Sequence, residues 1–570
     1  MSRPGGTPTR DPTGIRKYIP MLAWLPGYGA TGGLRADVVA GISLAALLIP
    51  ESLGYAEIAG VPPEIGLYAA PAALILYAIF GGSRLLVVAT ASAVAAVSAG
   101  IVGSIAAGDE EVAIAITAAL AIVAGLVALA LGVLRMGWVS NFMSKAVMEG
   151  FIVGLSISII IGQLDAMAGV HVEGESAVAE LGDLVSQIGS WDRLTLALGL
   201  GSLGLLFAFE RFMPKLPAAL VVVGLGIALV SILDLQVAVV GEIPRGLPQF
   251  GLPQIGLDQW LALIPGGMAI VLVGFSEGFA AAKDAVEPHE RLDANQELIG
   301  LGASSVGAGL SGGMVVSGSL SKTAASKVSG ATSQVANIVS AGVVLLTLLV
   351  LAPLFTNLPE ATLGAVVIHA VWRSADPRRL APFGRVLRAE LGLAIVVLAT
   401  VLFVGEIAGV ILGVIISLLV VIYRISYPRI VELGRDPLTG GIVGLDSHPQ
   451  AVRASGVVVA RFDAPLIYSN AETFKQTVLR IVSEAERPGT VVIDAEAITD
   501  IDSTGGDALV DTVATLRELG SEVRLVRVHT RIREALERGG MIDEIGPETF
   551  FSDSDLAAAM SQAGARKTET

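Results

Sequence analysis

The sequence of 570 residues carries too few charges and too many apolar side chains for a soluble protein of this length. Hydrophobic residues make up 53% of the chain and charged residues only 16%, against about 25% in a typical soluble domain. The mean hydropathy of +0.73 predicts a membrane protein, and the formal net charge of −15 argues against nucleic acid as a partner. The absence of cysteine excludes disulfides and thiolate chemistry.

Residues 1–34 are polar and predict a cytoplasmic N-terminal segment without a cleaved signal peptide. From 35 to 425, apolar runs follow one another, and several approach the ~20 residues that cross a bilayer. Two stretches, 85–102 and 312–330, are shorter and are interrupted by serine, threonine and glycine, which predicts half-helices. Full spans are expected at 37–58, 64–81, 112–134, 139–161, 193–209, 217–234, 261–282, 293–310, 332–352 and 361–373, with two more in 390–424.

The two interrupted stretches occupy matching places in two halves of the membrane part. Thr90 follows Glu51 by about 40 residues, and Ser319 follows Glu277 by a similar distance. Matching short segments of this kind are typical of transporters built from inverted repeats, with the binding site between the halves. We therefore predict an all-α polytopic membrane protein with 14 segments, seven in each half. The halves are expected at about 35–235 and 260–425.

The charge of the loops predicts the orientation, because cytoplasmic loops carry an excess of lysine and arginine. Basic residues gather before the first span and again in one late loop. Both loops, and with them both termini, are therefore expected in the cytoplasm, and the protein in the inner (plasma) membrane. The basic residues are Arg3, Arg10, Arg16, Lys17 and Arg35 before the first span, and Arg373, Arg378, Arg379, Arg385 and Arg388 in the late loop.

After Tyr423 the composition becomes that of a soluble α/β domain, which holds about half of the net negative charge. We expect a linker at 426–453, the domain at 454–562 and a tail at 563–570. Within the domain, strands are expected at 457–460, 491–493 and 523–528, and helices at 507–519 and 530–538.

Several motifs resemble those of one known family. The run from Asp37 to Pro71 (DVVAGISLAALLIPESLGYAEIAGVPPEIGLYAAP) and the later Gly82-Ser83-Arg84 resemble the opening of the SulP sulfate-permease family, which includes relatives of pendrin and prestin. The segment 318–323 (GSLSKT) is similar to the family motif G-S-x-S-R-T, and the C-terminal part resembles a STAS domain. The resemblance implies a seven-plus-seven inverted repeat with core and gate domains, secondary anion transport and a homodimer.

The predicted anion site lies at the starts of the two half-helices. A helix N-terminus presents unpaired N–H groups and about half a positive charge, which suits an anion. The alternative is that the small hydroxyl residues only cap the half-helices or allow close packing. Together with the resemblance, the pattern predicts an anion-binding site that comprises Glu51, Tyr55, Thr90, Ala91, Ser92, Ser319, Leu320, Ser321 and Lys322.

Charged residues within this apolar part are candidates for coupling. Glu277 is predicted to carry a coupling proton, since a carboxylate in a membrane span is costly and usually functional. Sodium is less favoured, because Ala281 stands where sodium-using members have a hydroxyl. Lys322 replaces the family arginine; it keeps the charge but loses the planar fork, so a bidentate grip on an oxyanion is less favoured. The alternative for Lys322 is that it reaches the surface or pairs with a carboxylate. The alternative for Glu277 is a permanent ion pair with Lys322, and Glu51 is expected to be protonated during transport or bonded to the first half-helix.

One motif belongs to the soluble domain. Asp502 and Ser503 follow an expected strand and precede an expected helix. In related anti-sigma antagonists this position carries a phosphorylated serine, which makes Ser503 a candidate for regulatory phosphorylation. The alternative is that Asp502 or Ser503 is an ordinary helix cap.

The sequence predicts a secondary active transporter of small anions of the sulfate, bicarbonate or dicarboxylate class, with proton symport by alternating access. Catalytic motifs and metal-ligand spacings are absent, so neither an enzyme nor a metal or organic cofactor is expected. An uncoupled exchanger or channel on the same fold is one alternative. Another is an anion-sensing signalling protein that acts on a cytoplasmic partner through its STAS domain.

Overall fold

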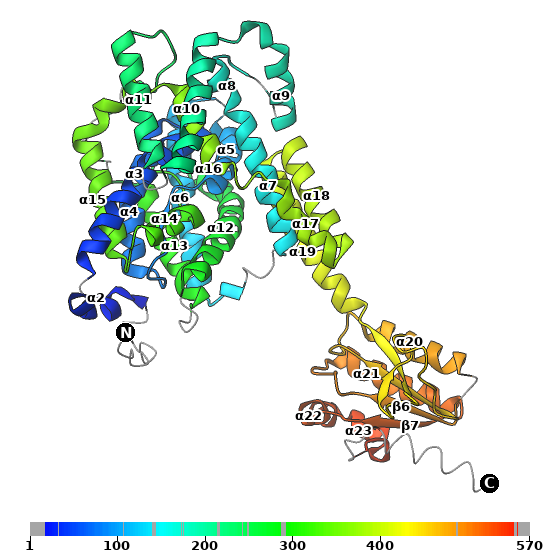
Figure 1. The fold of residues 1–570 in the computed structure, drawn as a ribbon. Helices are drawn as coiled ribbons and strands as arrows, with labels where there is room; N and C mark the ends of the chain where they lie inside the picture. Colours follow the sequence, from blue (N-terminus) through cyan, green and yellow to red (C-terminus); the bar gives the residue numbers. More distant parts are fainter. Residues whose placement is uncertain are drawn as a thin grey trace. The chain divides into compact units, whose positions relative to one another are not determined.

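The computed structural model describes residues 18–31, 33–106, 108–138, 144–172, 176–213, 217–241, 250–286, 292–485 and 488–551, with a few short pieces beside these ranges. The predicted tail, 563–570, lies outside the described residues. The chain forms two compact units, Met1–Ser417 and Leu418–Thr570, whose elements are labelled in Figure 1.

Helices form at all the predicted full spans, including two in the last apolar run. By length and composition, eight described helices can cross a membrane, and three shorter apolar helices accompany them. The helices of the first half are α3 (Leu34–Ile58), α4 (Pro63–Phe80), α5 (Ser92–Ala106), α6 (Glu110–Val133), α7 (Lys145–Gly162), α8 (Leu164–Ala168), α9 (Ala177–Ser186), α10 (Arg193–Phe212) and α11 (Ala218–Leu233). Those of the second half are α12 (Leu257–Ala285), α13 (Ala294–Leu310), α14 (Leu320–Val328), α15 (Val335–Leu346), α16 (Glu360–Val371), α17 (Ala381–Val386), α18 (Arg388–Phe403) and α19 (Glu406–Ser426).

The two halves interleave, as an inverted repeat requires. α13 packs against α4 and α6, α15 against α3 and α4, and α12 against α5 and α6, so each of these pairs joins one half to the other. Small residues allow the close contact: a Cβ on Gly302 would lie 2.7 Å from the Gly125 carbonyl oxygen. A second group pairs α7 with α18 and α10 with α11 and α16. These two groups correspond to the core and gate domains that the resemblance implies.

The half-helices begin later than the sequence suggests. The expected stretches 85–102 and 312–330 each start as extended chain, with β1 (Val88–Ala89) and β2 (Ser317–Gly318) paired antiparallel. Only then do α5 and α14 begin. The paired strands satisfy some of each other's backbone N–H and C=O groups, as irregular backbone in a membrane domain requires. Two-residue strands carry no readable periodicity, which explains why the sequence did not reveal them.

The N-terminal segment is more structured than predicted. Residues 21–31, expected within a polar segment, form α2 (Met21–Thr31). The Tyr28 hydroxyl donates to Asp37 at 2.9 Å, and the same buried carboxylate accepts from the backbone N–H groups of Thr332 and Ser333 at 2.6 and 3.2 Å. Asp37 therefore ties the start of α3 to the loop that follows α14.

The second unit is a five-stranded sheet in the order β4-β3-β5-β6-β7, with β5, β6 and β7 parallel and β3 antiparallel to its neighbours. The predicted strands and helices of this domain are confirmed. The expected linker 426–453 is wrong, because it contributes β3 and β4 to the sheet; Val431 and Leu433 alternate inward over too short a run to be recognised. The elements are β3 (Ile430–Arg435), β4 (Ile442–Gly444), β5 (Val457–Phe462), α20 (Ala471–Glu484), β6 (Thr490–Asp494), α21 (Ser503–Glu518), β7 (Glu522–Val526), α22 (Thr530–Arg538) and α23 (Met541–Ile545).

Candidate functional site

The strand pair β1–β2 brings the starts of the two half-helices together. Val88 pairs with Gly318 and Ala89 with Ser317, and the Ser319 N–H donates to the Val87 carbonyl at 3.0 Å. α5 and α14 leave this pair within a few residues, so their N-terminal ends meet at one place. Antiparallel pairing is what a two-fold axis between the halves produces. The first-turn N–H groups of both helices are therefore available at a common site.

At the start of α14, the side chains divide between the protein interior and an open face. Ser319 is the N-cap: its hydroxyl accepts from the Lys322 N–H at 3.3 Å and lies 3.2 Å from the Ser321 hydroxyl. Lys322 and Thr323 are buried, whereas Leu320 and Ser321 are exposed. Because α14 packs on α3 and α12, its exposed face is the one that can meet a ligand. Ser319 and Ser321 therefore lie together at the start of α14, with Ser321 on its exposed face.

Lys322 is fully buried, with 0% of its surface exposed, and does not reach the surface. Its Nζ lies 2.6 Å from Glu51 Oε2 and donates to the Thr90 carbonyl oxygen at 3.0 Å. It also lies 4.7 Å from the centre of the Tyr55 ring, a cation–π distance. The alternative prediction that Lys322 pairs with Glu277 is wrong, because the carboxylate that forms the ion pair with Lys322 is that of Glu51. The sequence did not suggest this pair, because its members stand 271 positions apart and no repeat of the sequence relates them.

At the start of α5, backbone groups are more available to a ligand than side chains. The Thr90 hydroxyl is fully buried and lies 2.9 Å from the Ser52 hydroxyl, so it faces α3 and not the open site. Ala91 is the buried cap, since its carbonyl accepts from the Ala95 N–H at 3.0 Å. Ser92, half-buried, is the first helical residue. Of the residues predicted here, Ser92 remains able to contact a ligand through its side chain, and Ser52 is a partner that the sequence did not indicate.

Glu277 lies on α12, close to the same place. Its Oε2 is buried and has no hydrogen-bond partner among the residues that the structure describes. The carboxylate lies within electrostatic range of Lys322 and of Tyr55. Ala281, one turn later, is buried and offers no hydroxyl. One buried oxygen of this carboxylate therefore has no hydrogen bond among the described residues, within electrostatic range of a buried ammonium.

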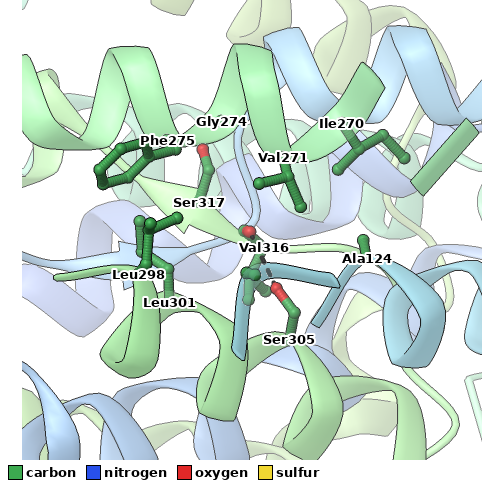
Figure 2. Close-up of a pocket in the computed structure, with 11 residues that line it drawn as sticks. Ala124, Ile270, Val271, Gly274, Phe275, Leu298, Leu301, Ser305, Val316 and Ser317 are labelled. Carbon is green, nitrogen blue, oxygen red and sulfur yellow. Dashed lines mark hydrogen bonds between the residues drawn. The ribbon is translucent and has the colours of Figure 1, made fainter. Parts of the chain in front are cut away.

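α12 approaches β2 more closely than any side chain would allow. A Cβ on Gly318 would lie 2.6 Å from the Gly278 Cα, and one on Gly274 would lie 3.1 Å from the Ser317 Cβ. Ser317 points toward α12 (Figure 2), and together with Val316 and other residues it lines a cavity of about 20 Å³. The cavity has room for about one water molecule. The glycines therefore set the distance between the Glu277 helix and the half-helix starts.

Acidic side chains gather elsewhere, in the loop after α7. Asp165 and Glu180 line a cavity of about 70 Å³. Burial, and then the charges of Glu406 and Asp165, raise the pKa of Glu180, on α9, to about 7. Within the described ranges, no group of three or more His, Asp or Glu residues is arranged to hold a metal ion. This cluster therefore does not add a metal site.

In the second unit, Asp502 caps α21, as one of the two predicted readings requires. The Gly505 N–H donates to Asp502 Oδ1 and the Tyr468 N–H to Oδ2, each at 2.8 Å. Ser503 is the first residue of the helix and is exposed. The cap is therefore Asp502, and the Ser503 hydroxyl is accessible beside a helix N-terminus.

Comparison with known proteins agrees with this architecture. Residues 34–399 match the model of the sulfate permease family, and residues 448–557 match that of the STAS domain. A probable sulfate transporter of Mycobacterium tuberculosis (strain CDC 1551 / Oshkosh) is 34% identical over 525 residues, which cover 91% of this chain and 93% of that protein. The chloroplastic sulfate transporter 4.1 of Arabidopsis thaliana is 28% identical over 560 residues, covering 94% of this chain and 81% of the plant protein.

Solved structures show the same fold. The structure of the murine Solute Carrier 26 family member A9 anion transporter in the inward-facing state matches with a TM-score of 0.87 at 24% identity, over 97% of this chain and 94% of that one. The transmembrane domain of the cyanobacterial bicarbonate transporter BicA matches with a TM-score of 0.57 at 24% identity, over 68% of this chain and 97% of that one. The chain is therefore a multi-pass membrane protein of the sulfate permease family, a family of anion transporters and not of enzymes, with a C-terminal STAS domain.

Proposed function

We propose that the chain is a secondary active transporter that carries a small anion together with protons by alternating access. The observation that carries this proposal is the meeting of two half-helix starts beside the buried ammonium of Lys322. Two helix N-termini and one cation suffice to replace part of the hydration shell of an oxyanion. Ser92, Ser319 and Ser321 would contact the anion through their hydroxyls, with backbone N–H groups of both first turns. Leu320 lies beside them on the open face.

The substrate belongs to the sulfate, bicarbonate or dicarboxylate class, and sulfate is the first to test because the curated relatives bear the name of sulfate transporters. Glu277 would bind a proton on one side of the membrane and release it on the other, which compensates part of the anion's charge. The unpartnered Oε2 of Glu277 supports this role. The same membrane part can also serve an uncoupled exchanger, a channel or an anion sensor, and these are outcomes of the experiment.

The experiment uses the purified full-length chain in proteoliposomes, with the membrane potential held at zero and the outside more acidic than the inside. For each pH unit of gradient, every proton carried with the anion multiplies the equilibrium accumulation of radiolabelled sulfate by about ten. We expect accumulation in the wild type. In Glu277→Gln the ratio of inside to outside sulfate should be about tenfold lower per pH unit, because one proton-binding side chain is lost.

Equal sulfate concentrations on both sides would contradict coupling and indicate a channel or exchanger, and no sulfate flux would indicate another anion or a sensor. An unchanged ratio in Glu277→Gln would remove Glu277 from the coupling. The control is Glu111→Gln, an exposed carboxylate at the start of α6.

A bulky side chain at Ser321 tests the position of the site. Ser321→Trp fills the open face at the start of α14, so we expect sulfate to lose its ability to stabilise the protein against heat. Val328→Trp places the same side chain at the far end of the same helix, where the residue is 89% exposed, and should behave as the wild type. Thermal unfolding in detergent with increasing sulfate measures both. If sulfate stabilises Ser321→Trp as much as the wild type, the anion does not bind at the start of α14.

For the whole protein, we propose an inner (plasma) membrane location with both termini cytoplasmic, a homodimer, and a cytoplasmic protein partner of the STAS domain. Phosphorylation of Ser503 would add negative charge at the start of α21, where the helix dipole favours it. The exposed Ser503 beside the Asp502 cap supports this candidate.

A further inference from the structure

The charge of Lys322 is already neutralised inside the protein. Glu51 Oε2 lies 2.6 Å from Nζ, and the carboxylate side chain is only 5% exposed. An ammonium donates three hydrogen bonds, and here two of them go to Glu51 and the Thr90 carbonyl. While this pair persists, an anion at the half-helix starts gains little from Lys322, because the neighbouring carboxylate repels it as strongly as the ammonium attracts it.

The charges around this site can be counted. With Glu51 and Glu277 both ionised, they outweigh Lys322 by one negative charge. One proton makes the three groups neutral together, and a second makes them positive. Tyr55, whose hydroxyl donates to Glu51 Oε2 at 3.4 Å, is the other titratable group here. On the other helices packed against α3, the remaining titratable side chains interact elsewhere or are exposed. Glu64 interacts with Glu110 and Tyr68, Tyr77 with Glu297, Glu360 with Glu57 and Asp165, and His369 with Glu210, while Lys327 is exposed.

We propose that Glu51 is a second proton carrier, whose protonation releases Lys322 to bind the anion. A hydronium ion on the acidic side gives a proton to the Glu51 carboxylate: its O–H bond breaks, water is left, an O–H bond forms on Glu51, and the ion pair with Lys322 opens. Lys322 stays protonated and turns its freed N–H bonds toward the anion. On the other side of the membrane the anion leaves, Glu51 returns its proton to water and the pair forms again. This inference rests on the proposed function and raises its stoichiometry to two protons per anion.

The accumulation experiment distinguishes one proton from two. At zero membrane potential the wild type should reach about a hundredfold sulfate ratio per pH unit, and Glu51→Gln and Glu277→Gln about tenfold each. The double variant should only equilibrate sulfate. A wild-type ratio of about tenfold, or an unchanged ratio in Glu51→Gln, would overturn the role of Glu51 while leaving proton coupling intact. Absence of any accumulation in the wild type would instead contradict the proposed function.

A second measurement covers the case in which Glu51→Gln does not fold. Glu51→Asp keeps the charge that Lys322 needs, so the pair and the fold should survive. Infrared difference spectra of the wild type with and without sulfate should show a protonated carboxyl band, and this band should shift in Glu51→Asp. If Glu51→Asp leaves every sulfate-induced carboxyl band in place, Glu51 does not take up a proton and the proposal is overturned.

Discussion

Replacing Lys322 by methionine should abolish sulfate uptake and lower the free energy of unfolding by about 3–5 kcal/mol, the usual cost of removing one partner of a buried ion pair. Methionine fills a similar volume without charge. Glu51 would then be left buried beside it, and the Thr90 carbonyl would lose the donor that it has at 3.0 Å. Uptake into proteoliposomes and unfolding in detergent measure the two effects.

The controls separate stability from binding. Lys327→Met removes an exposed lysine from the last turn of the same helix and should change neither quantity appreciably. Combining Lys322→Met with Glu51→Gln removes the unpaired carboxylate, so stability should return while uptake stays lost. Sulfate uptake by Lys322→Met at the wild-type rate would show that the anion does not use this ammonium.

The second large effect is expected from Gly318→Ala. The added methyl group would lie 2.6 Å from the Gly278 Cα, and this is a backbone contact that cannot move aside as a flexible side chain can. Overpacking of this kind costs about 1–3 kcal/mol. Because α12 and β2 would have to separate, Glu277 should move away from the half-helix starts, and both sulfate uptake and its dependence on the pH gradient should fall.

Gly103→Ala is the matched control, since a Cβ there meets nothing within 4 Å and the residue lies on α5, one of the two half-helices. Alanine also has the higher helix propensity, so this variant should be at least as stable as the wild type. If Gly318→Ala folds and accumulates sulfate as well as Gly103→Ala does, the contact between α12 and β2 does not position the site.

Two side-chain contacts could not be predicted from the sequence, for physical reasons. The ion pair between Glu51 and Lys322 joins the two halves of the chain, and a single glutamate or lysine does not indicate its partner. The contact between the hydroxyls of Thr90 and Ser52, 2.9 Å apart, is a similar case, because nothing in the sequence indicates that these two residues meet. Both contacts exist only after α3, β1 and α14 have packed together.

By itself, the sequence determined the class of protein, the membrane spans, the duplication and the two stretches that contain the half-helices, but not the residue at which each half-helix begins. These follow from local quantities, namely apolar length, hydroxyl and glycine content, and the spacing from Glu51 to Thr90 and from Glu277 to Ser319. Only the tertiary structure decided which carboxylate neutralises Lys322 and which stays unpartnered. In the packed structure Lys322 pairs with Glu51, and Glu277 Oε2 has no hydrogen bond among the described residues. The energy of a buried charge depends on the groups within a few ångströms of it, whatever their separation in sequence.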